Sequence, residues 1–322
     1  MVHKKQIFNQ WLERIESFLS IPKKEIGQLC ATKKQIGKQV TVAMVQTLSR
    51  TDLKDICNKF GTVLVDECHH MPARMFRAVI KQFNPYYLYG LTATPERKFK
   101  DDRLTYVYLG EILSQIESNS VSTEPIGTKT NNRSVASRLK VIIRKTDFNL
   151  PFKITVSNSQ LMLKMLTFDT ARNSQICSNI LIEARAGSKC LVLTERRDHA
   201  DVLTAYLSKE LETITLTGEL TEKRKSEKLQ QIDTGHFQVI IATGQLLGEG
   251  TDIGGLDSLF LVYPFSFHGK LTQYIGRITC DFPKGTKGKI YDYRDFKIGY
   301  LDRIFRRRKA YYDKNNFKVS KN

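Results

Sequence analysis

The spacing of apolar side chains near the start of the chain predicts an amphipathic helix over residues 8–19. Six apolar residues recur there at intervals of one, three or four positions, which places them on one helical face: Phe8, Trp11, Leu12, Ile15, Phe18 and Leu19. The pattern then changes to short apolar or alternating runs typical of strands, at VTVAMVQTL (40–48), TVLV (62–65) and YYLYGLTAT (86–94). A helical pattern, FRAVIKQF (76–83), lies between the last two. Strands that alternate with helices indicate a parallel α/β sheet.

A second α/β series follows further along the chain. Apolar runs predict strands at 189–194, 213–218, 237–243 and 256–264. Helical patterns separate them, near 171–186, 197–211, 221–233 and 270–277. Between the two series, residues 117–138 are rich in Ser, Thr and Asn and include Pro125 and Gly127, which is typical of an exposed connection. We therefore predict two domains, 1–118 and 151–322, joined by a linker over 119–150.

The chain ends in a basic segment with interleaved aromatic residues, LDRIFRRRKAYYDKNNFK (301–318), for which we predict a helix. Two roles are open, and they are compatible. The helix can pack on the second domain through its apolar positions, which are Leu301, Ile304 and Phe305. It can also extend a track for nucleic acid through Arg306, Arg307, Arg308, Lys309 and Tyr311. We favour packing.

The net charge of the chain indicates what kind of partner it binds. The chain has 322 residues, of which 41% are hydrophobic, so it can bury ordinary cores. Its formal net charge is +18. A protein this basic usually binds a polyanion, and nucleic acid is the commonest. The alternative is a solvated basic surface without a ligand.

The cysteines and the apolar runs exclude several other classes. Six cysteines are scattered without a CxxC pair, which argues against a zinc site and a disulfide framework and fits a reducing compartment. No apolar run approaches the roughly 18 residues that a membrane-spanning helix needs. The first residues, MVHKKQIFNQW, do not have the pattern of a signal peptide. We expect a soluble, cytoplasmic protein.

Candidate chemistry lies at the end of the second predicted strand, in GTVLVDECHHM (61–71). Ligands bind at the carboxyl ends of strands in a parallel sheet. Asp66 there could hold Mg²⁺ through water, and Glu67 could activate a water for attack on a γ-phosphate. His69 is close enough to couple this site to its surroundings. An acidic loop without catalytic function is the alternative.

The end of a second predicted strand supports a functional role for the acidic loop. LTATPER (91–97) follows about 25 residues later, and Thr92 and Thr94 supply hydroxyls that can reach the acidic loop. DECH followed by TATP resembles motifs II and III of the superfamily 2 helicases, in the branch that includes DNA-repair helicases and type III restriction subunits. On this resemblance the acid pair is a Walker B site, and DECH is a variant of the DEAH box.

Further strings match the same family in the same order along the chain. VAMVQTLSR (42–50) resembles motif Ib, with Gln46 and Thr47 as nucleic-acid contacts. KCLVLTERRDHADVL (189–203) resembles motif IV, and LTG (216–218) resembles a segment that touches the nucleic-acid backbone through Thr217 and Gly218. IATGQLLGEGTDIGGLD (241–257) resembles motif V, and QYIGR (273–277) resembles motif VI.

The resemblance implies a fold of two RecA-like α/β domains with parallel sheets, the first incomplete, and an ATP-dependent helicase or translocase that uses ATP and Mg²⁺. It implies nucleic acid as the partner and favours DNA over RNA. Roles carried over to the second domain are nucleic-acid contact for Thr243, nucleotide binding for Gly250 and Asp252, coupling for Gln273 and catalysis for Arg277. Catalytic roles in the first domain fall to Asp66, Glu67 and His69, and coupling roles to Thr92 and Thr94.

Two departures from the family pattern concern catalysis. The phosphate-binding loop, GxxxxGK[ST], does not occur in the sequence. Cys280 also stands where relatives usually carry a second arginine of motif VI. We expect a truncated or split helicase first, then a chain that works with a partner supplying the missing strand and loop. The remaining alternative is a non-catalytic accessory protein that only binds nucleic acid. A first domain without that strand would leave an exposed sheet edge.

Overall fold

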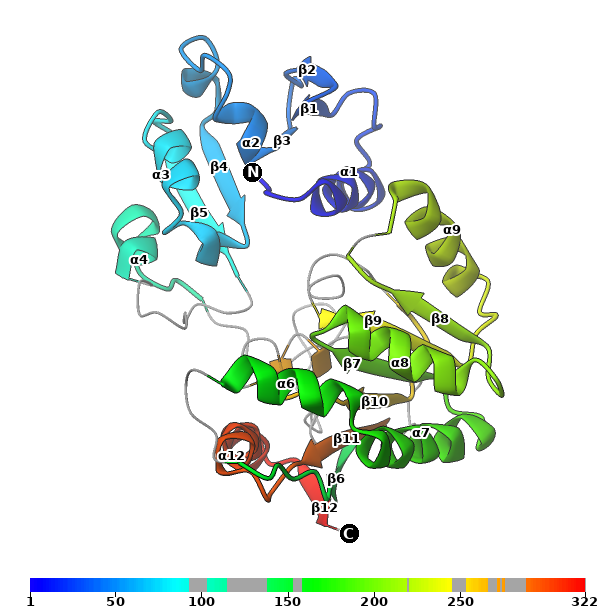
Figure 1. The fold of residues 1–322 in the computed structure, drawn as a ribbon. Helices are drawn as coiled ribbons and strands as arrows, with labels where there is room; N and C mark the ends of the chain where they lie inside the picture. The colour runs from blue at the N-terminus through cyan, green and yellow to red at the C-terminus, as the bar shows by residue number, and fades with distance from the viewer. Residues whose placement is uncertain are drawn as a thin grey trace, which may run out of the picture. The chain divides into compact units, whose positions relative to one another are not determined.

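The computed structural model divides into two compact units, residues 1–115 and 116–322, and each is described by itself (Figure 1). The structure describes residues 1–92, 103–114, 138–152, 158–218, 220–244, 253–265, 271–272, 274–275 and 288–321. Among these residues, no helix is both long and apolar enough to cross a membrane.

The first unit is built from short strands covered by helices. Its strands are β1 (Gly27–Cys30), β2 (Lys33–Gln35), β3 (Thr41–Ala43), β4 (Thr62–Asp66) and β5 (Tyr87–Leu91). Its helices are α1 (Lys5–Leu19), α2 (Val45–Leu48), α3 (Arg74–Ile80) and α4 (Arg103–Leu109), with short 3₁₀ turns η1 (Cys57–Lys59) and η2 (Cys68–His70). The strands form one sheet in the order β2-β1-β3 and a parallel pair β4-β5.

The backbone of Met1 and Val2 lies between these two groups of strands and bonds to both. On one side, Val2 N donates to Ala43 O at 2.9 Å and Val2 O accepts from Val45 N at 2.9 Å. On the other side, Asp66 N donates to Met1 O at 3.0 Å. This segment therefore fixes β4, and the acidic residues at its end, against the sheet that carries α2.

Two predictions for this unit need correction. The strand expected over 40–48 ends at Ala43, because Thr47 N and Leu48 N both donate to Met44 O and begin a helical turn. Val45 and Leu48 are both buried, so the apolar spacing serves that turn. In α1, the apolar face predicted to run to Leu19 is buried only through Ile15; Phe18 and Leu19 are 73% and 59% exposed.

The second unit is a seven-stranded parallel sheet in the order β12-β6-β11-β10-β7-β9-β8. Its strands are β6 (Leu139–Lys145), β7 (Cys190–Thr194), β8 (Thr213–Leu216), β9 (Val239–Thr243), β10 (Ser258–Leu261), β11 (Gly288–Arg294) and β12 (Lys318–Lys321). The sheet therefore includes residues 139–145, which the sequence placed in the linker. Every residue of β7 and β10 is buried, as expected for strands covered on both faces.

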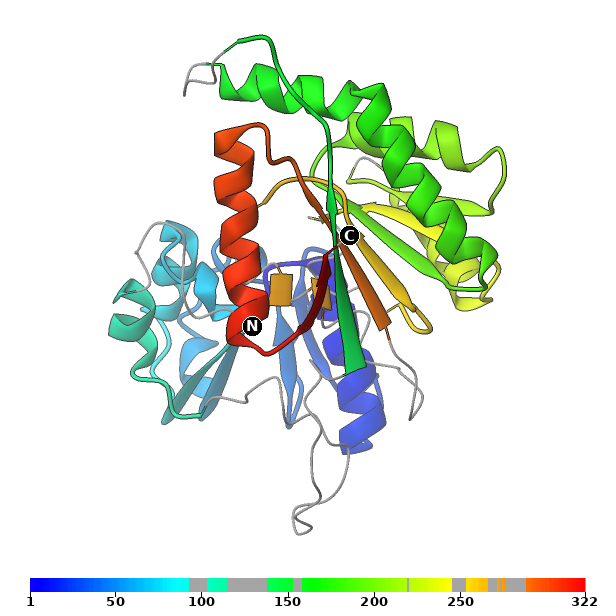
Figure 2. The same cartoon turned by 90° about the horizontal axis from the view of Figure 1, so that it is seen from below.

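Helices pack on both faces of this sheet (Figure 2). They are α6 (Ser159–Phe168), α7 (Thr170–Arg185), α8 (Arg197–Leu207), α9 (Glu222–Asp233) and α12 (Gly299–Lys314). One apolar cluster joins α7 and α8 to the sheet through side chains such as Ile180 and Leu203. A separate cluster on the sheet joins α9 and α12 through side chains such as Ile232 and Phe305.

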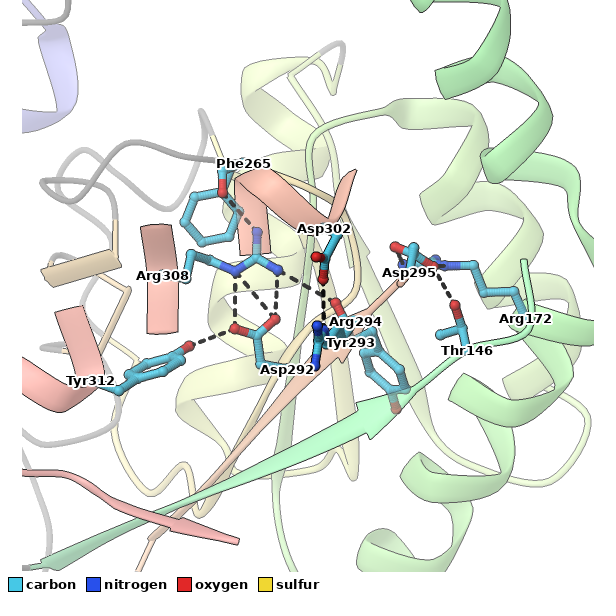
Figure 3. Close-up of polar contacts among 10 residues, drawn as sticks. All are labelled: Thr146, Arg172, Phe265, Asp292, Tyr293, Arg294, Asp295, Asp302, Arg308 and Tyr312. Atoms are coloured by element: carbon cyan, nitrogen blue, oxygen red, sulfur yellow. Dashed lines mark hydrogen bonds and ion pairs between the residues drawn. The ribbon is translucent and has the colours of Figure 1, made fainter. Parts of the chain in front are cut away.

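The basic helix α12 is anchored by a buried ion pair to β11 (Figure 3). Arg308 donates from Nη2 to Asp292 Oδ1 at 2.7 Å and from Nε to Oδ2 at 2.9 Å. Tyr312 OH donates to Asp292 Oδ2 at 2.9 Å. Burial alone would lower the pKa of Arg308, but Asp292 outweighs it and the pKa is raised. Leu301 and Phe305 are buried as the packing interpretation expected, whereas Arg308 is 2% exposed and cannot belong to a surface track.

A buried histidine links α8 to β7 and α7. His199 Nδ1 lies 3.0 Å from Thr194 Oγ1, and Nε2 lies 3.0 Å from Asn173 Oδ1. Since the amide oxygen only accepts, Nε2 carries the proton and Nδ1 accepts from the threonine hydroxyl. Burial, with the charge of Arg172 adding to it, lowers the pKa of His199 to about 3. This histidine therefore stays neutral in the folded protein.

Acidification should destabilise the second unit through His199. In the unfolded chain a histidine has a pKa of about 6.5, so below that pH the unfolded chain binds a proton that the folded chain does not. The free energy of unfolding therefore falls as the pH drops from that value towards 3. We expect this residue alone to lower the free energy of unfolding by about 2 kcal/mol between pH 7 and pH 5. Urea unfolding at pH 7 and at pH 5 measures this difference in the free energy of unfolding, which should be smaller in His199→Gln than in the unsubstituted chain. It should persist in His236→Gln, which changes an exposed histidine of the same unit; an equal effect of both substitutions would contradict the assignment.

Candidate active site

The acid pair lies at the carboxyl end of β4, as the sequence predicts. Asp66 is the last residue of the strand, and Glu67 follows with a φ of 51°, in the left-handed region. A residue with a side chain rarely adopts that conformation, and such strain is concentrated at functional sites. The turn ends the strand abruptly and starts η2, which carries His69.

The carboxylate of Asp66 is held by two donors. Trp11 Nε1 in α1 donates to Oδ2 at 2.7 Å, and Glu67 N donates to Oδ1 at 2.9 Å. One donor sits on each oxygen, so rotation of the carboxylate is restricted. Each oxygen still has a free lone-pair direction, because an ionised carboxylate offers about four acceptor sites.

Glu67, His69 and Thr92 come together at the ends of β4 and β5. His69 Nδ1 lies 3.0 Å from Glu67 Oε2 and 3.0 Å from Thr92 Oγ1. Burial alone would raise the pKa of Glu67, but the neighbouring imidazole of His69, with those of His70 and His3, outweighs it and lowers that pKa. Glu67 is therefore ionised at neutral pH, in the form that can accept a proton.

The rings of His3, His69 and His70 form a group of tilted contacts beside Glu67. The ring centroids of His3 and His70 are 4.3 Å apart, as are those of His69 and His70. Burial, with the charge of Lys4, lowers the pKa of His3. This packing leaves His69 within reach of both Glu67 and Thr92.

The acidic loop fits a hydrated Mg²⁺ shared with phosphates. Within the described residues, no group of three or more His, Cys, Asp or Glu side chains could hold a metal by itself. Mg²⁺ usually takes only one or two carboxylates and completes its shell with water and substrate phosphates. Glu67 Oε2 is buried and, although close to His69, is not aligned for any hydrogen bond in the described structure. An ordered water could satisfy that oxygen, so Asp66 and Glu67 suit the metal and water roles respectively.

The predicted nucleic-acid residues lie on separate elements, and their role stays a prediction. Gln46 in α2 donates from Nε2 to His3 O at 2.6 Å, which ties that helix to the N-terminal segment. Thr47, its neighbour, is half-buried. In the second unit, Thr217 is buried after β8 while Gly218 is exposed, and Thr243 ends β9 half-buried. Five other predicted positions lie outside the described residues: Thr94, Gly250, Asp252, Gln273 and Arg277, together with the departure at Cys280.

Sequence reasoning missed the part played by Trp11 and by the first residues of the chain. Trp11 was placed on the apolar face of the first helix, where it does pack against a small cluster with Val2, Phe8 and Val42. Its indole N–H was the available signal, since a buried indole usually finds an acceptor. Nothing in the spacing indicates that the acceptor lies 55 residues away.

Two family models match the chain. Residues 1–97 match the model described as "Type III restriction enzyme, res subunit", and residues 172–280 match "Helicase conserved C-terminal domain". The first covers the acidic loop with its histidines and Thr92, and the second covers β7 to β10. The two matches lie in different compact units.

Individual proteins show the same similarity. A protein of Acanthamoeba polyphaga mimivirus that carries the name of an ATP-dependent RNA helicase is 25% identical over 325 residues, covering 100% of this chain and 60% of its own length. The DNA 3'-5' translocase XPB2 of Sulfurisphaera tokodaii is 23% identical, covering 84% of this chain and 66% of its own length. This chain thus spans about three fifths to two thirds of those relatives. The structure of S. cerevisiae Dbp5 bound to RNA and ADP BeF3 has a similar fold, with a TM-score of 0.65, 16% identity and coverage of 100% of this chain and 75% of its own.

Proposed function

The chain belongs to the superfamily 2 helicases, and from that premise we propose that it acts in ATP-dependent translocation along nucleic acid, with DNA as the preferred partner. Its parallel α/β sheet is of the RecA-like kind. The observation that carries the catalytic part is the contact of His69 Nδ1 with both Glu67 and Thr92, at 3.0 Å each. It joins a base, ionised at neutral pH, to the end of the neighbouring strand.

In this proposal Glu67 orients and deprotonates the attacking water. Its low pKa, set by the histidines, leaves it without a proton of its own at neutral pH. Asp66, fixed by Trp11 and Glu67 N, would hold Mg²⁺, which neutralises charge on the phosphates when bound. His69 ties the position of Glu67 to Thr92 at the end of β5. A movement of β5 would then change the placement of the base.

The sequence contains no candidate for the phosphate-binding loop. We propose that it comes from a further polypeptide segment with the GxxxxGK[ST] pattern, and that this segment pairs with β5. Within the described structure β5 pairs only with β4. The face beside that edge exposes apolar side chains: Leu64, Tyr87, Tyr89 and Leu91. A parallel strand added to β5 would end beside Thr92, which is where a phosphate loop would have to begin.

ATP hydrolysis decides between this proposal and the non-catalytic alternative. We would compare the chain with a fusion that places a strand–GxxxxGKT–helix unit before Met1, each with and without single-stranded DNA. An amide at Met1 could make the hydrogen bond to Leu64 O that the amino group makes at 2.6 Å, so the fusion should preserve the sheet. DNA-stimulated turnover in either protein supports the motor. DNA binding without turnover in both would favour the accessory protein.

Nucleic-acid binding should depend steeply on salt. Neutralising about six phosphates of a single strand releases condensed counterions, so the association constant should fall by about 10²- to 10³-fold between 50 and 200 mM salt. The net charge of +18 provides the cations. Fluorescence anisotropy with labelled DNA and RNA of equal length measures the effect. Tighter binding of the RNA would contradict the preference for DNA, and salt-independent binding would contradict backbone recognition.

A further inference from the structure

Trp11 is the one side chain from a distant element that touches Asp66 among the described contacts. Its Nε1 donates to Oδ2 at 2.7 Å across 55 positions of sequence. In the whole chain it is also the only tryptophan. Both facts matter, because the first gives this residue a role at the acidic site and the second makes that role measurable.

The helix that carries Trp11 is firmly placed. Phe8, Leu12 and Ile15 of α1 are 0%, 9% and 5% exposed and pack into one apolar cluster. That cluster includes Val2, whose backbone pairs with β3 while its neighbour Met1 accepts from Asp66 N. The backbone of Met1 and Val2 therefore connects the cluster that holds the indole to the strand that ends in Asp66.

A single donor on Oδ2 would leave the carboxylate free to turn about its bond to the β-carbon. Glu67 N donates a second hydrogen bond, to Oδ1 at 2.9 Å, and so limits this rotation. Glu67 N belongs to a backbone already committed to the left-handed turn at φ 51°. Together the two donors take one acceptor site on each oxygen of Asp66, and the remaining acceptor sites are available to a cation.

We propose that Trp11 is a positioning residue for the divalent cation of this site: its indole N–H fixes Asp66 in the orientation that receives hydrated Mg²⁺. The inference rests on the metal role given to Asp66 in the proposed function. Donors that orient a metal-binding side chain typically contribute 10- to 100-fold in metal affinity. Removal of the indole N–H should therefore weaken cation binding by about that factor, with the helix left in place.

The test exploits the single tryptophan. Biosynthetic replacement of tryptophan by β-(3-benzothienyl)alanine changes position 11 alone and exchanges the N–H for a sulfur at nearly constant ring volume. Mn²⁺ serves as the probe, and the loss of its free electron-paramagnetic-resonance signal gives the dissociation constant for the full chain. Asp66→Asn identifies the part of the binding that belongs to this site. Trp11→Phe is a second variant, and circular dichroism with thermal unfolding checks that each protein is folded.

We expect the dissociation constant for Mn²⁺ to rise about 10- to 100-fold in the benzothienyl protein and in Trp11→Phe. In the unsubstituted chain, Mn²⁺ at Asp66 should also change the Trp11 emission, and Asp66→Asn should abolish that change. A folded benzothienyl protein with unaltered, Asp66-dependent affinity would overturn the inference and leave the metal role intact. Mn²⁺ binding that does not depend on Asp66 would overturn both, so the two failures are distinguishable.

Discussion

Glu67→Gln is expected to lower DNA-stimulated ATP hydrolysis by about 10²- to 10⁴-fold, the usual contribution of a positioned general base. Glutamine keeps the size of the side chain and can still meet His69, but its amide cannot accept the proton of the attacking water. The same substitution removes the carboxylate whose low pKa the histidines maintain. Affinity for DNA should stay within a few-fold, because Glu67 makes no contact that the proposal gives to nucleic acid.

The measurement is steady-state turnover of whichever form hydrolyses ATP, the chain or the fusion with the phosphate loop. Glu13→Gln is the matched control, since Glu13 is an exposed glutamate on α1 of the same unit. It should leave turnover unchanged. If Glu67→Gln retained turnover within about threefold, the base would have to be another group, and the contact with His69 would be structural only.

The sequence predicted that the ends of β4 and β5 meet at this site, because that follows from the direction of the two strands. β4 and β5 are parallel, with Asp66 opposite Leu91 in register, so their carboxyl ends must lie together. Glu67, His69 and Thr92 then meet because each follows such an end within a few residues. No long-range information is needed for that inference beyond the direction of two strands.

The contacts that the sequence did not predict join segments whose proximity does not follow from the order and direction of strands. Trp11 reaches Asp66 across 55 residues, and Gln46 reaches His3 O across 43. Gln46 illustrates the difficulty, because the sequence predicts that it contacts nucleic acid, while its amide nitrogen bonds to the chain's own backbone. Hydrophobic periodicity identifies the face of an element, but it does not identify the partner of a polar atom on that face.

Two other differences had a signal in the sequence. LKVIIRK (139–145) has the apolar run of a buried strand, yet it directly follows a polar stretch and was absorbed into the linker; it forms β6. Arg308 lies in a basic run whose composition is typical of an exposed segment. Its spacing from Leu301, Phe305 and Tyr312, however, places it on the buried face of the same helix. Period is thus a better guide to its burial than local composition.

Arg308→Met is expected to lower the free energy of unfolding of the second unit by about 3–5 kcal/mol. Removing one partner of a buried ion pair leaves the other charge without compensation, and that penalty is large. Asp292 is 0% exposed and, among the contacts of the described residues, would retain only the hydroxyl of Tyr312 at 2.9 Å. Phe265 O would also lose the donor that Arg308 Nη1 supplies at 2.7 Å. Urea unfolding followed by circular dichroism measures the change.

Two further variants separate lost charge from lost packing. Arg303→Met, at an exposed position of the same helix, should change stability by no more than about 0.5 kcal/mol. The double variant Arg308→Met with Asp292→Leu removes both charges, so it should recover most of the loss, because a well-packed apolar pair often replaces a buried ion pair at little cost. If the double variant were no more stable than Arg308→Met alone, the uncompensated carboxylate could not be the source of the penalty. The anchoring of α12 would then rest on the apolar contacts of Leu301 and Phe305 and on the shape of the arginine side chain, with its charge secondary.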